Sequence, residues 1–242
     1  MPVPARPAPR RLPDQRSIGW VAAVLGGAGL VTGFVIAPPD AVQGEAARLM
    51  YLHVPAAWTA YLAFGVVLVG SIGYLRSGNR RWDRAAQAAA EIGVALGVLT
   101  IALGSVWGRA AWGVWWAWDP RIVSTVLLVL LYAGYLAGRR VGADPCRAAR
   151  RSAVAGIAGV ALVPVVHFSV VWWRSLHQRA TILAPDPDPP IDPMMLTALT
   201  LCVAAFTVAG TWLFLRRLAQ LRQSDKAPED TVVPPALVGE QR

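Results

Sequence analysis

The sequence predicts an all-α integral membrane protein with six transmembrane helices, and three of its properties lead to that prediction. The chain has 242 residues, of which 55% are hydrophobic and only 15% charged, so it is too apolar for an ordinary soluble domain. Its apolar residues form long uncharged runs, and its arginines gather in short clusters between those runs. Because lipid offers the peptide backbone no hydrogen-bond partners, each run that crosses the bilayer must be a helix.

Six uncharged runs are about as long as the roughly 20 residues that cross a ~30 Å hydrocarbon core. In the third run, Glu91 lies near one end, within reach of Arg84, and the fourth run is short. The predicted spans are Ser17–Ala37, Val54–Leu75, Gln87–Val106, Ile122–Gly138, Ser152–Trp173 and Pro193–Leu215.

These spans divide the chain into three parts. Residues 1–16, with four arginines among prolines, are predicted to be a disordered basic cytoplasmic arm. Residues 17–217 are predicted to form the six-helix membrane domain, and residues 218–242 a flexible cytoplasmic tail. The first run is long enough to span the membrane, so we expect a retained helix rather than a cleaved signal peptide.

The distribution of arginine predicts which way the helices run. Arginines cluster in the N-terminal arm and in residues 76–84, 139–151 and 216–222, and these segments alternate with three connections that are poor in lysine and arginine. By the positive-inside rule, both termini face the cytoplasm and residues 107–124 face outward. The net charge of +9 is therefore assigned to membrane topology rather than to nucleic-acid binding.

Residues 107–124, with the sequence WGRAAWGVWWAWDPRIVS, contain five of the eleven tryptophans of the chain. The large flat faces of tryptophan suit either a planar ligand or a membrane interface. Eight tryptophans lie at the predicted outer ends of the spans and three near the inner ends, an asymmetry that favours a ligand site over an aromatic belt. With Gly108, Gly113 and the turn signal Asp119-Pro120, this segment is predicted to be an aromatic shelf in a loop. Its tryptophans are Trp107, Trp112, Trp115, Trp116 and Trp118.

Two of the three histidines are predicted to lie beside that shelf. His53 follows the first outer loop, and His177 lies just beyond the outer end of the fifth span, so the two could approach each other at the outer face. A pair of neutral imidazoles on opposite sides of a plane is what haem iron accepts, and the macrocycle would then lie against the tryptophans. Arg48 and Arg121 are the predicted donors to the two haem propionates. His167, inside the fifth span, is expected to be structural.

Each of these residues also has an ordinary interpretation. A histidine near a membrane interface is more often a polar side chain at the headgroup level than a ligand, and tryptophans at helix ends more often form a belt. Arg48 or Arg121 alone would usually contact lipid headgroups. Asp119 alone would most often be the N-cap of the span that starts near Ile122, a role compatible with a ligand site. The functional interpretation depends on all of them gathering at one face.

Three segments resemble the tryptophan-rich WWD family of haem-handling membrane proteins, and within it the CcmC (haem exporter protein C) group of cytochrome c maturation. They are YLHVPAAW at 51–58, WGRAAWGVWWAWDPR at 107–121 and HFSVVWWRSLHQ at 167–178. The order of these segments, the chain length and the six predicted spans agree with that group, so the resemblance covers nearly the whole chain.

The resemblance implies that haem b is a bound cargo at the periplasmic face of a bacterial inner membrane. Its iron would be held by His53 and His177 as axial ligands, with residues 107–119 against the ring. The resemblance also implies delivery of haem to the chaperone CcmE, which binds it covalently through its own histidine. Partners would be the ATP-binding-cassette subunits CcmA and CcmB and the small protein CcmD. We therefore expect a haem-transfer protein rather than a conventional enzyme.

Three alternatives stay open from the sequence. The nearest is a haem-lyase subunit of another cytochrome c maturation system. A membrane b-type cytochrome would need histidine pairs within the spans, whereas only His167 lies inside one. A permease for a polar substrate would need intramembrane charge, which is nearly lacking apart from Glu91. The chain has no P-loop, GxSxG or zinc-ligand spacing, so ATP hydrolysis and hydrolytic catalysis have no support in the sequence.

Overall fold

The prediction of an all-α integral membrane protein is confirmed. The computed structural model describes residues 15–141, 144–178 and 191–224, and the regular elements within those ranges are all helical. Six helical segments are long and apolar enough to cross a membrane, one for each predicted span. The elements are α1 (Gln15–Val31), η1 (Thr32–Ile36), η2 (Glu45–Leu49), α2 (Met50–Ser77), α3 (Arg80–Trp112), α4 (Pro120–Gly138), α5 (Pro145–Val160), α6 (Leu162–Trp172) and α7 (Pro193–Ser224).

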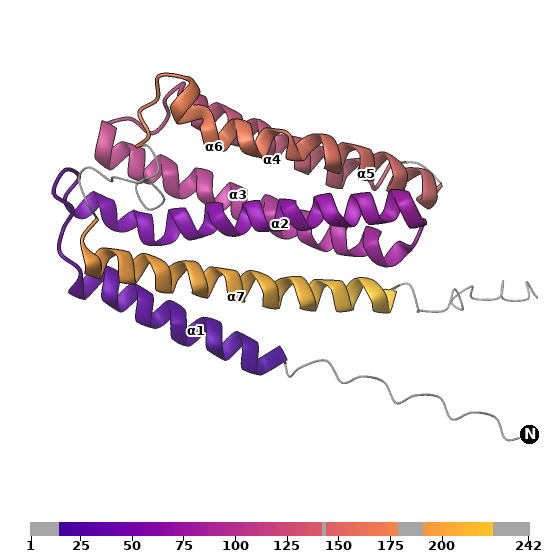
Figure 1. Cartoon of the computed structure of the whole chain (residues 1–242), viewed down its shortest axis with the longest axis horizontal. Coiled ribbons are helices and arrows are strands. Elements are labelled where there is room, and N and C mark those ends of the chain that lie inside the picture. Colours follow the sequence, from indigo (N-terminus) through magenta and orange to yellow (C-terminus); the bar gives the residue numbers. More distant parts are fainter. Residues whose placement is uncertain (1–14, 142–143, 179–190, 225–242) are drawn as a thin grey trace, which may run out of the picture.

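The helices pack in layers (Figure 1). The pair α2 and α3 lies in the middle, with α1 beside α7 on one side and α4, α5 and α6 on the other. In the core between α2 and α4, the rings of Phe64 and Tyr132 stack with centroids 4.0 Å apart. Gly93 on α3 makes room for Phe64, because a Cβ at Gly93 would lie 2.6 Å from that ring. Small residues thus let the helix backbones approach closely, as is common between membrane helices.

The fifth span is divided into α5 and α6 by a break at Ala161. Pro164 follows three residues later and has no backbone N–H for the carbonyl of Val160. Its ring would also clash with that carbonyl in a regular helix. The break therefore has a local cause, and the two helices together remain one span, Pro145–Trp172.

The prediction that the tryptophan-rich segment is a shelf in a loop is wrong for two of its tryptophans. Trp107 and Trp112 belong to the last turns of α3, and the loop comprises residues 113–119 alone. The helix ends at Gly113, whose φ of +79° is a left-handed conformation that glycine adopts without steric cost. Its N–H donates to the carbonyl of Arg109 at 3.2 Å.

The end of the membrane domain also differs from the prediction. α7 continues to Ser224, so residues 218–224 of the predicted tail are helical. Leu218 is buried against the bundle, which gives this extension a packing contact. The rest of the predicted tail (225–242) and residues 1–14 of the predicted arm lie outside the described residues.

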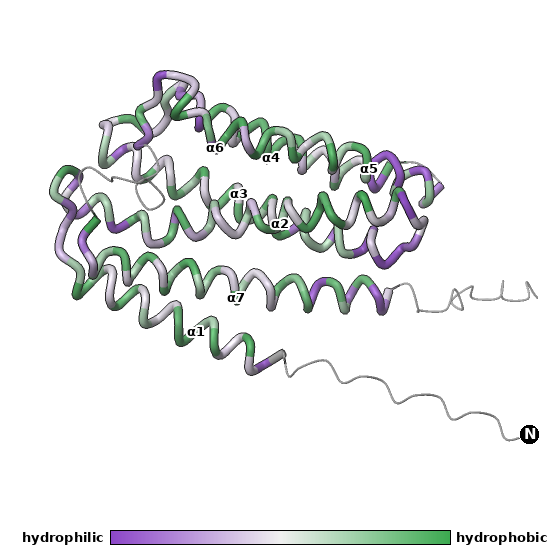
Figure 2. Tube along the Cα trace, viewed as in Figure 1, coloured by the Kyte–Doolittle hydropathy of each residue, from purple (hydrophilic) through white to green (hydrophobic). Residues whose placement is uncertain are grey.

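The basic connections lie together at one end of the bundle. Figure 2 shows hydrophilic residues at the α2–α3 turn, around the α4–α5 connection and at the end of α7. Glu91 forms its ion pair there with Arg217 of α7. Both residues come from long helices that pack together, and the Arg217 Nη2 to Glu91 Oε1 distance is 3.0 Å. Residues 113–119 lie at the opposite end of the bundle (Figure 1).

Candidate functional site

Asp119 connects the start of α4 to the loop that follows α6. As the N-cap of α4, its Oδ1 accepts a hydrogen bond from the backbone N–H of Arg121 at 2.9 Å. The same oxygen lies 3.0 Å from Nδ1 of His177. Oδ2 accepts hydrogen bonds from Ser175 Oγ at 2.8 Å and from the backbone N–H of Leu176 at 2.7 Å. With 4% of its surface exposed, this one carboxylate fixes both the start of a helix and the orientation of a distant imidazole.

These contacts determine the charge states of Asp119 and His177. Burial raises the pKa of Asp119, but the hydrogen bonds from Ser175 and Leu176 outweigh it, so this pKa lies below its ordinary value. Burial lowers the pKa of His177, the charge of Arg121 lowers it further, and Asp119 acts in the opposite direction. At neutral pH we expect an ionised Asp119 beside a neutral His177. The proton then sits on Nδ1, and Nε2 keeps a free lone pair for a metal.

His53 lies in the first turn of α2, against the C-terminal end of α3. Its ring is edge-on to Trp107, with centroids 5.6 Å apart and planes at 83°. Gly104, one turn before Trp107, leaves room for this ring, because a Cβ at Gly104 would lie 2.9 Å from His53 Cε1. His53 and His177 are near enough to interact electrostatically. The structure therefore brings these two histidines into one neighbourhood.

Arg121 contributes positive charge to the same neighbourhood. Its Nη2 donates to the backbone carbonyl of His167 at 2.9 Å, which ties α4 to α6. Its charge interacts with both His53 and His177, and with Tyr61 of α2. An anionic group beside the histidines would therefore meet a nearby guanidinium.

Buried polar atoms without partners also mark this region. Within the described ranges, three buried side-chain polar atoms have no hydrogen-bond partner: His53 Nδ1, Arg121 Nε and Ser71 Oγ. Folded proteins leave few such atoms, and two of these three belong to the residues around His177. No group of three or more His, Cys, Asp or Glu in the described ranges is placed to hold a metal ion. This donor set fits a metal-containing cofactor with two protein ligands better than a bare ion.

The five tryptophans of the segment divide into two groups. Trp107 and Trp112 face the histidines: Trp107 contacts His53 and donates to Gln43 Oε1 at 2.7 Å, while the Trp112 ring lies edge-on to His177 at 5.0 Å. The other three lie on the loop of residues 113–119 and are exposed, Trp118 by as much as 85%. They are Trp115, Trp116 and Trp118.

The side chains of Arg48 and His167, two residues that the sequence analysis singled out, do not join the hydrogen bonds around Asp119. The guanidinium of Arg48 binds the carboxylate of Glu45 and the carbonyls of Gly33 and Ala37, which ties η2 to η1. Arg48 thus takes no part in the hydrogen bonds around Asp119 that the structure describes. His167 is exposed on α6, and its carbonyl rather than its ring contacts Arg121.

Sequence reasoning missed Ser175 and Gln43. Ser175 precedes His177 by two residues in the same segment, so its hydroxyl was a visible candidate for supporting that histidine. Gln43 had no such signal, because it lies 64 residues from Trp107 and meets it only in the folded chain.

Comparisons with known proteins cover most of this chain. The family model described as "Heme exporter protein C" matches residues 11–231. A heme exporter protein C of Bradyrhizobium diazoefficiens is 38% identical over 203 residues, which is 83% of this chain and 76% of that protein. The heme exporter protein C of Escherichia coli K12 is 34% identical over 208 residues, 84% of this chain and 83% of that protein. A putative cytochrome c biosynthesis ccmC-like mitochondrial protein of Marchantia polymorpha is 35% identical over 150 residues, 61% of this chain and 62% of that protein.

Proposed function

Because this chain belongs to the heme exporter protein C family, we propose that it binds haem b and passes it on during cytochrome c maturation. The bound haem is cargo rather than a resident cofactor. The site faces the periplasm from a bacterial inner membrane, in line with the arginine-rich connections at the opposite end. One observation carries this proposal: the buried Asp119 lies 3.0 Å from Nδ1 of His177, which leaves Nε2 of that ring available to a metal, beside a second histidine.

His177 and His53 are the proposed axial ligands of the haem iron. A metal-binding histidine usually donates its other ring N–H to a carboxylate or carbonyl, which fixes the tautomer and the ring direction. Asp119 gives His177 that partner at 3.0 Å. His53 is positioned by Trp107 and by the space at Gly104. One histidine is thus held by a carboxylate, and the other by packing and by the nearby backbone of Thr100.

Arg121 is the proposed partner of a haem propionate. Its Nε is buried without a partner and its charge reaches both histidines, so a carboxylate there would gain a charge-assisted hydrogen bond. Arg48 would have to release Glu45 or a backbone carbonyl to do the same. We therefore assign Arg48 to holding the turn before α2. Arg48 would contact a propionate only after releasing one of these partners.

The exposed tryptophans are the proposed docking surface for the next haem carrier. Trp107 and Trp112 contact the histidines and would line the ring, whereas Trp115, Trp116 and Trp118 face outward. The partner is the haem chaperone CcmE, which takes the haem at its accessible edge and bonds it through its own histidine. CcmA, CcmB and CcmD complete the proposed exporter complex. The match over residues 11–231 favours this assignment over a haem-lyase subunit.

The visible absorption spectrum of the detergent-purified chain, co-expressed with the chaperone, tests the proposal. Wild type should carry haem, and His53→Ala and His177→Ala should each lose it or change its spectrum. His167→Ala is the matched control, because its ring is exposed on α6 and touches none of the proposed ligands. Unchanged haem content and chaperone loading in the His53→Ala, His177→Ala double variant would refute the site.

A further inference from the structure

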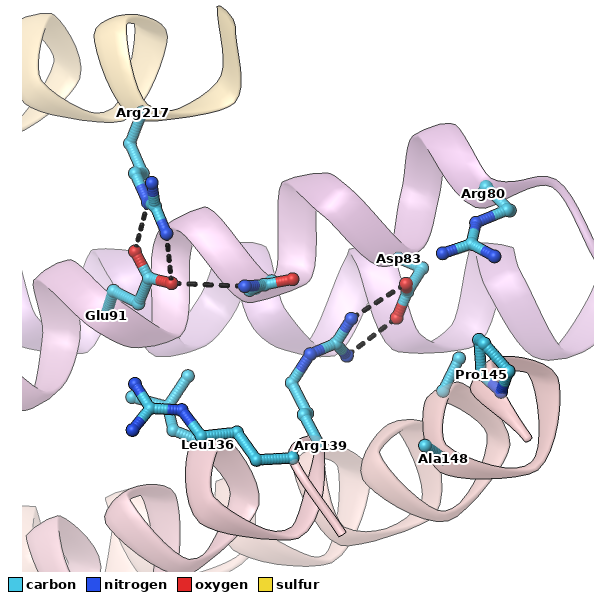
Figure 3. Close-up of a pocket in the computed structure, with 11 residues that line it drawn as sticks. Arg80, Asp83, Glu91, Leu136, Arg139, Pro145, Ala148 and Arg217 are labelled. Atoms are coloured by element: carbon cyan, nitrogen blue, oxygen red, sulfur yellow. Dashed lines mark hydrogen bonds and ion pairs between the residues drawn. The ribbon is translucent and has the colours of Figure 1, made fainter. Parts of the chain in front are cut away.

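A polar cavity lies among α3, α4, α5 and α7, at the end of the bundle opposite to residues 113–119. Its volume is about 480 Å³, which falls in the range of roughly 300–1,000 Å³ found for small-molecule sites. Figure 3 shows charged side chains of α3, α4 and α7 directed into it. The proposed haem site uses none of them.

The cavity carries a positive charge that its own carboxylates do not neutralise. Asp83 is bound in a fork by Arg139, at 2.7 and 2.8 Å, and Glu91 by Arg217. Arg80 and Arg140 also line the cavity, and neither has an ion pair among the residues that the structure describes. The four arginines and two carboxylates of the lining give a net charge of +2. Asp144, which neighbours the lining residue Pro145, is already paired with Arg147.

Two tryptophans on the helices that line this cavity favour a position at the level of a membrane interface. Trp82, between Arg80 and Asp83 on α3, is 43% exposed and packs on Gly73 of α2. Trp212 on α7 lies under the guanidinium of Arg216, with 4.9 Å from Cζ to the ring centroid. Tryptophans concentrate where lipid headgroups meet water, and basic pockets between helices at that depth bind anionic headgroups.

We propose that this cavity binds the phosphate-bearing headgroup of an anionic phospholipid. Arg80 and Arg140, which have no ion pair among the described residues, supply the positive charge that attracts the phosphate group, while the two internal ion pairs keep the cavity walls in place. Leu136 and Ala148 offer an apolar wall to the glycerol part of the lipid. The proposal shares with the haem assignment only the predicted orientation, in which this end faces the cytoplasmic leaflet.

Native mass spectrometry of the full chain in detergent, titrated with phosphatidylglycerol, tests this proposal. Wild type should retain one lipid per chain and prefer phosphatidylglycerol over zwitterionic phosphatidylcholine. The double variant Arg80→Gln, Arg140→Gln should bind phosphatidylglycerol roughly 25-fold more weakly, since each arginine near the headgroup level contributes about fivefold. Both side chains are exposed and outside the ion pairs, so the thermal unfolding midpoint should stay unchanged.

The matched control is Arg81→Gln, Arg150→Gln, which removes two exposed arginines from the same end without touching the cavity. This control should bind phosphatidylglycerol like wild type. An equal loss in both double variants would overturn the site, because general surface charge would then explain the binding. Saturation by inorganic phosphate without lipid retention would overturn the lipid assignment, and so would equal affinity for the two lipids.

Discussion

The Nδ1 atom of His177 lies 3.0 Å from Oδ1 of Asp119, and this contact joins the loop after α6 to the first turn of α4. It gives a proposed iron ligand a fixed tautomer and a fixed direction. Haem binding should therefore be sensitive to substitution of Asp119 and to protonation of His177.

Replacing Asp119 with asparagine should weaken haem binding by about 10- to 100-fold, the usual effect of losing a metal ligand's supporting partner. Asparagine remains a good helix N-cap, so α4 should still start at Pro120. Haem titration of the purified variant measures the change. Asp144→Asn is the control, because Asp144 is also an N-cap followed by proline, at the start of α5 and away from the histidines. Equal effects of the two substitutions would show that helix capping alone is responsible.

Gly104→Ala should reduce haem retention although residue 104 carries no ligand atom. The new methyl group would lie 2.9 Å from Cε1 and 3.3 Å from Nδ1 of His53, so the imidazole would have to move. Gly65→Ala, on the same helix as His53, meets nothing within 4 Å and should leave the haem spectrum unchanged. A wild-type spectrum for Gly104→Ala would mean that the position of the His53 ring does not govern binding.

Trp118→Ala should separate haem binding from haem transfer. Its side chain is 85% exposed, so its loss should not alter the fold or the bound haem, whereas chaperone loading should fall severalfold if the exposed tryptophans form the docking surface. Covalent haem on the chaperone, per haem bound to this chain, is the measurement. Trp20→Ala, 72% exposed at the other end of the bundle, is expected to load the chaperone normally. Normal loading with Trp118→Ala would argue against this surface.

Haem retention should be constant between about pH 6.5 and 8 and fall at lower pH. Burial, reinforced by Arg121, lowers the pKa of His177 below 6.5, so its imidazole stays neutral until the pH drops through that lowered pKa. The unfolded chain takes up this proton first, so the contribution of His177 to stability also decreases as pH falls below 6.5. In Asp119→Asn the pKa-raising influence of Asp119 is removed, and the fall should move to lower pH. A midpoint above pH 7 in wild type would contradict this account.

Arg139→Met should destabilise the chain by about 3–5 kcal/mol, because it leaves the Asp83 carboxylate buried without its partner. The double variant Asp83→Leu, Arg139→Met should recover much of that loss, since no unpaired charge remains. Denaturant unfolding in detergent measures both. Arg147→Met breaks the exposed pair with Asp144 and should leave the unfolding midpoint nearly unchanged. A double variant as unstable as the single one would mean that side-chain packing, not charge, explains the effect.

The sequence by itself determined the six helices and the clustering of arginines at their ends, because a membrane span depends on the composition of a continuous stretch and lipid forces that stretch to be helical. It also predicted Asp119 as a possible N-cap, which is a local property of the residues around Pro120. The sequence predicted the helix bounds less well, because α3 and α7 continue beyond the apolar runs into polar and charged residues.

Only the tertiary structure decided which side chains meet. The imidazole of His177 reaches a carboxylate 58 residues away, and Glu91 pairs with Arg217, 126 residues away. Two of the tryptophans contact histidines, and the other three are exposed at the protein surface. This division depends on the rotation of α3 about its axis and on the end of α3 at Gly113. Such contacts arise from how helices pack against one another, and a hydropathy pattern along one helix does not specify its neighbours.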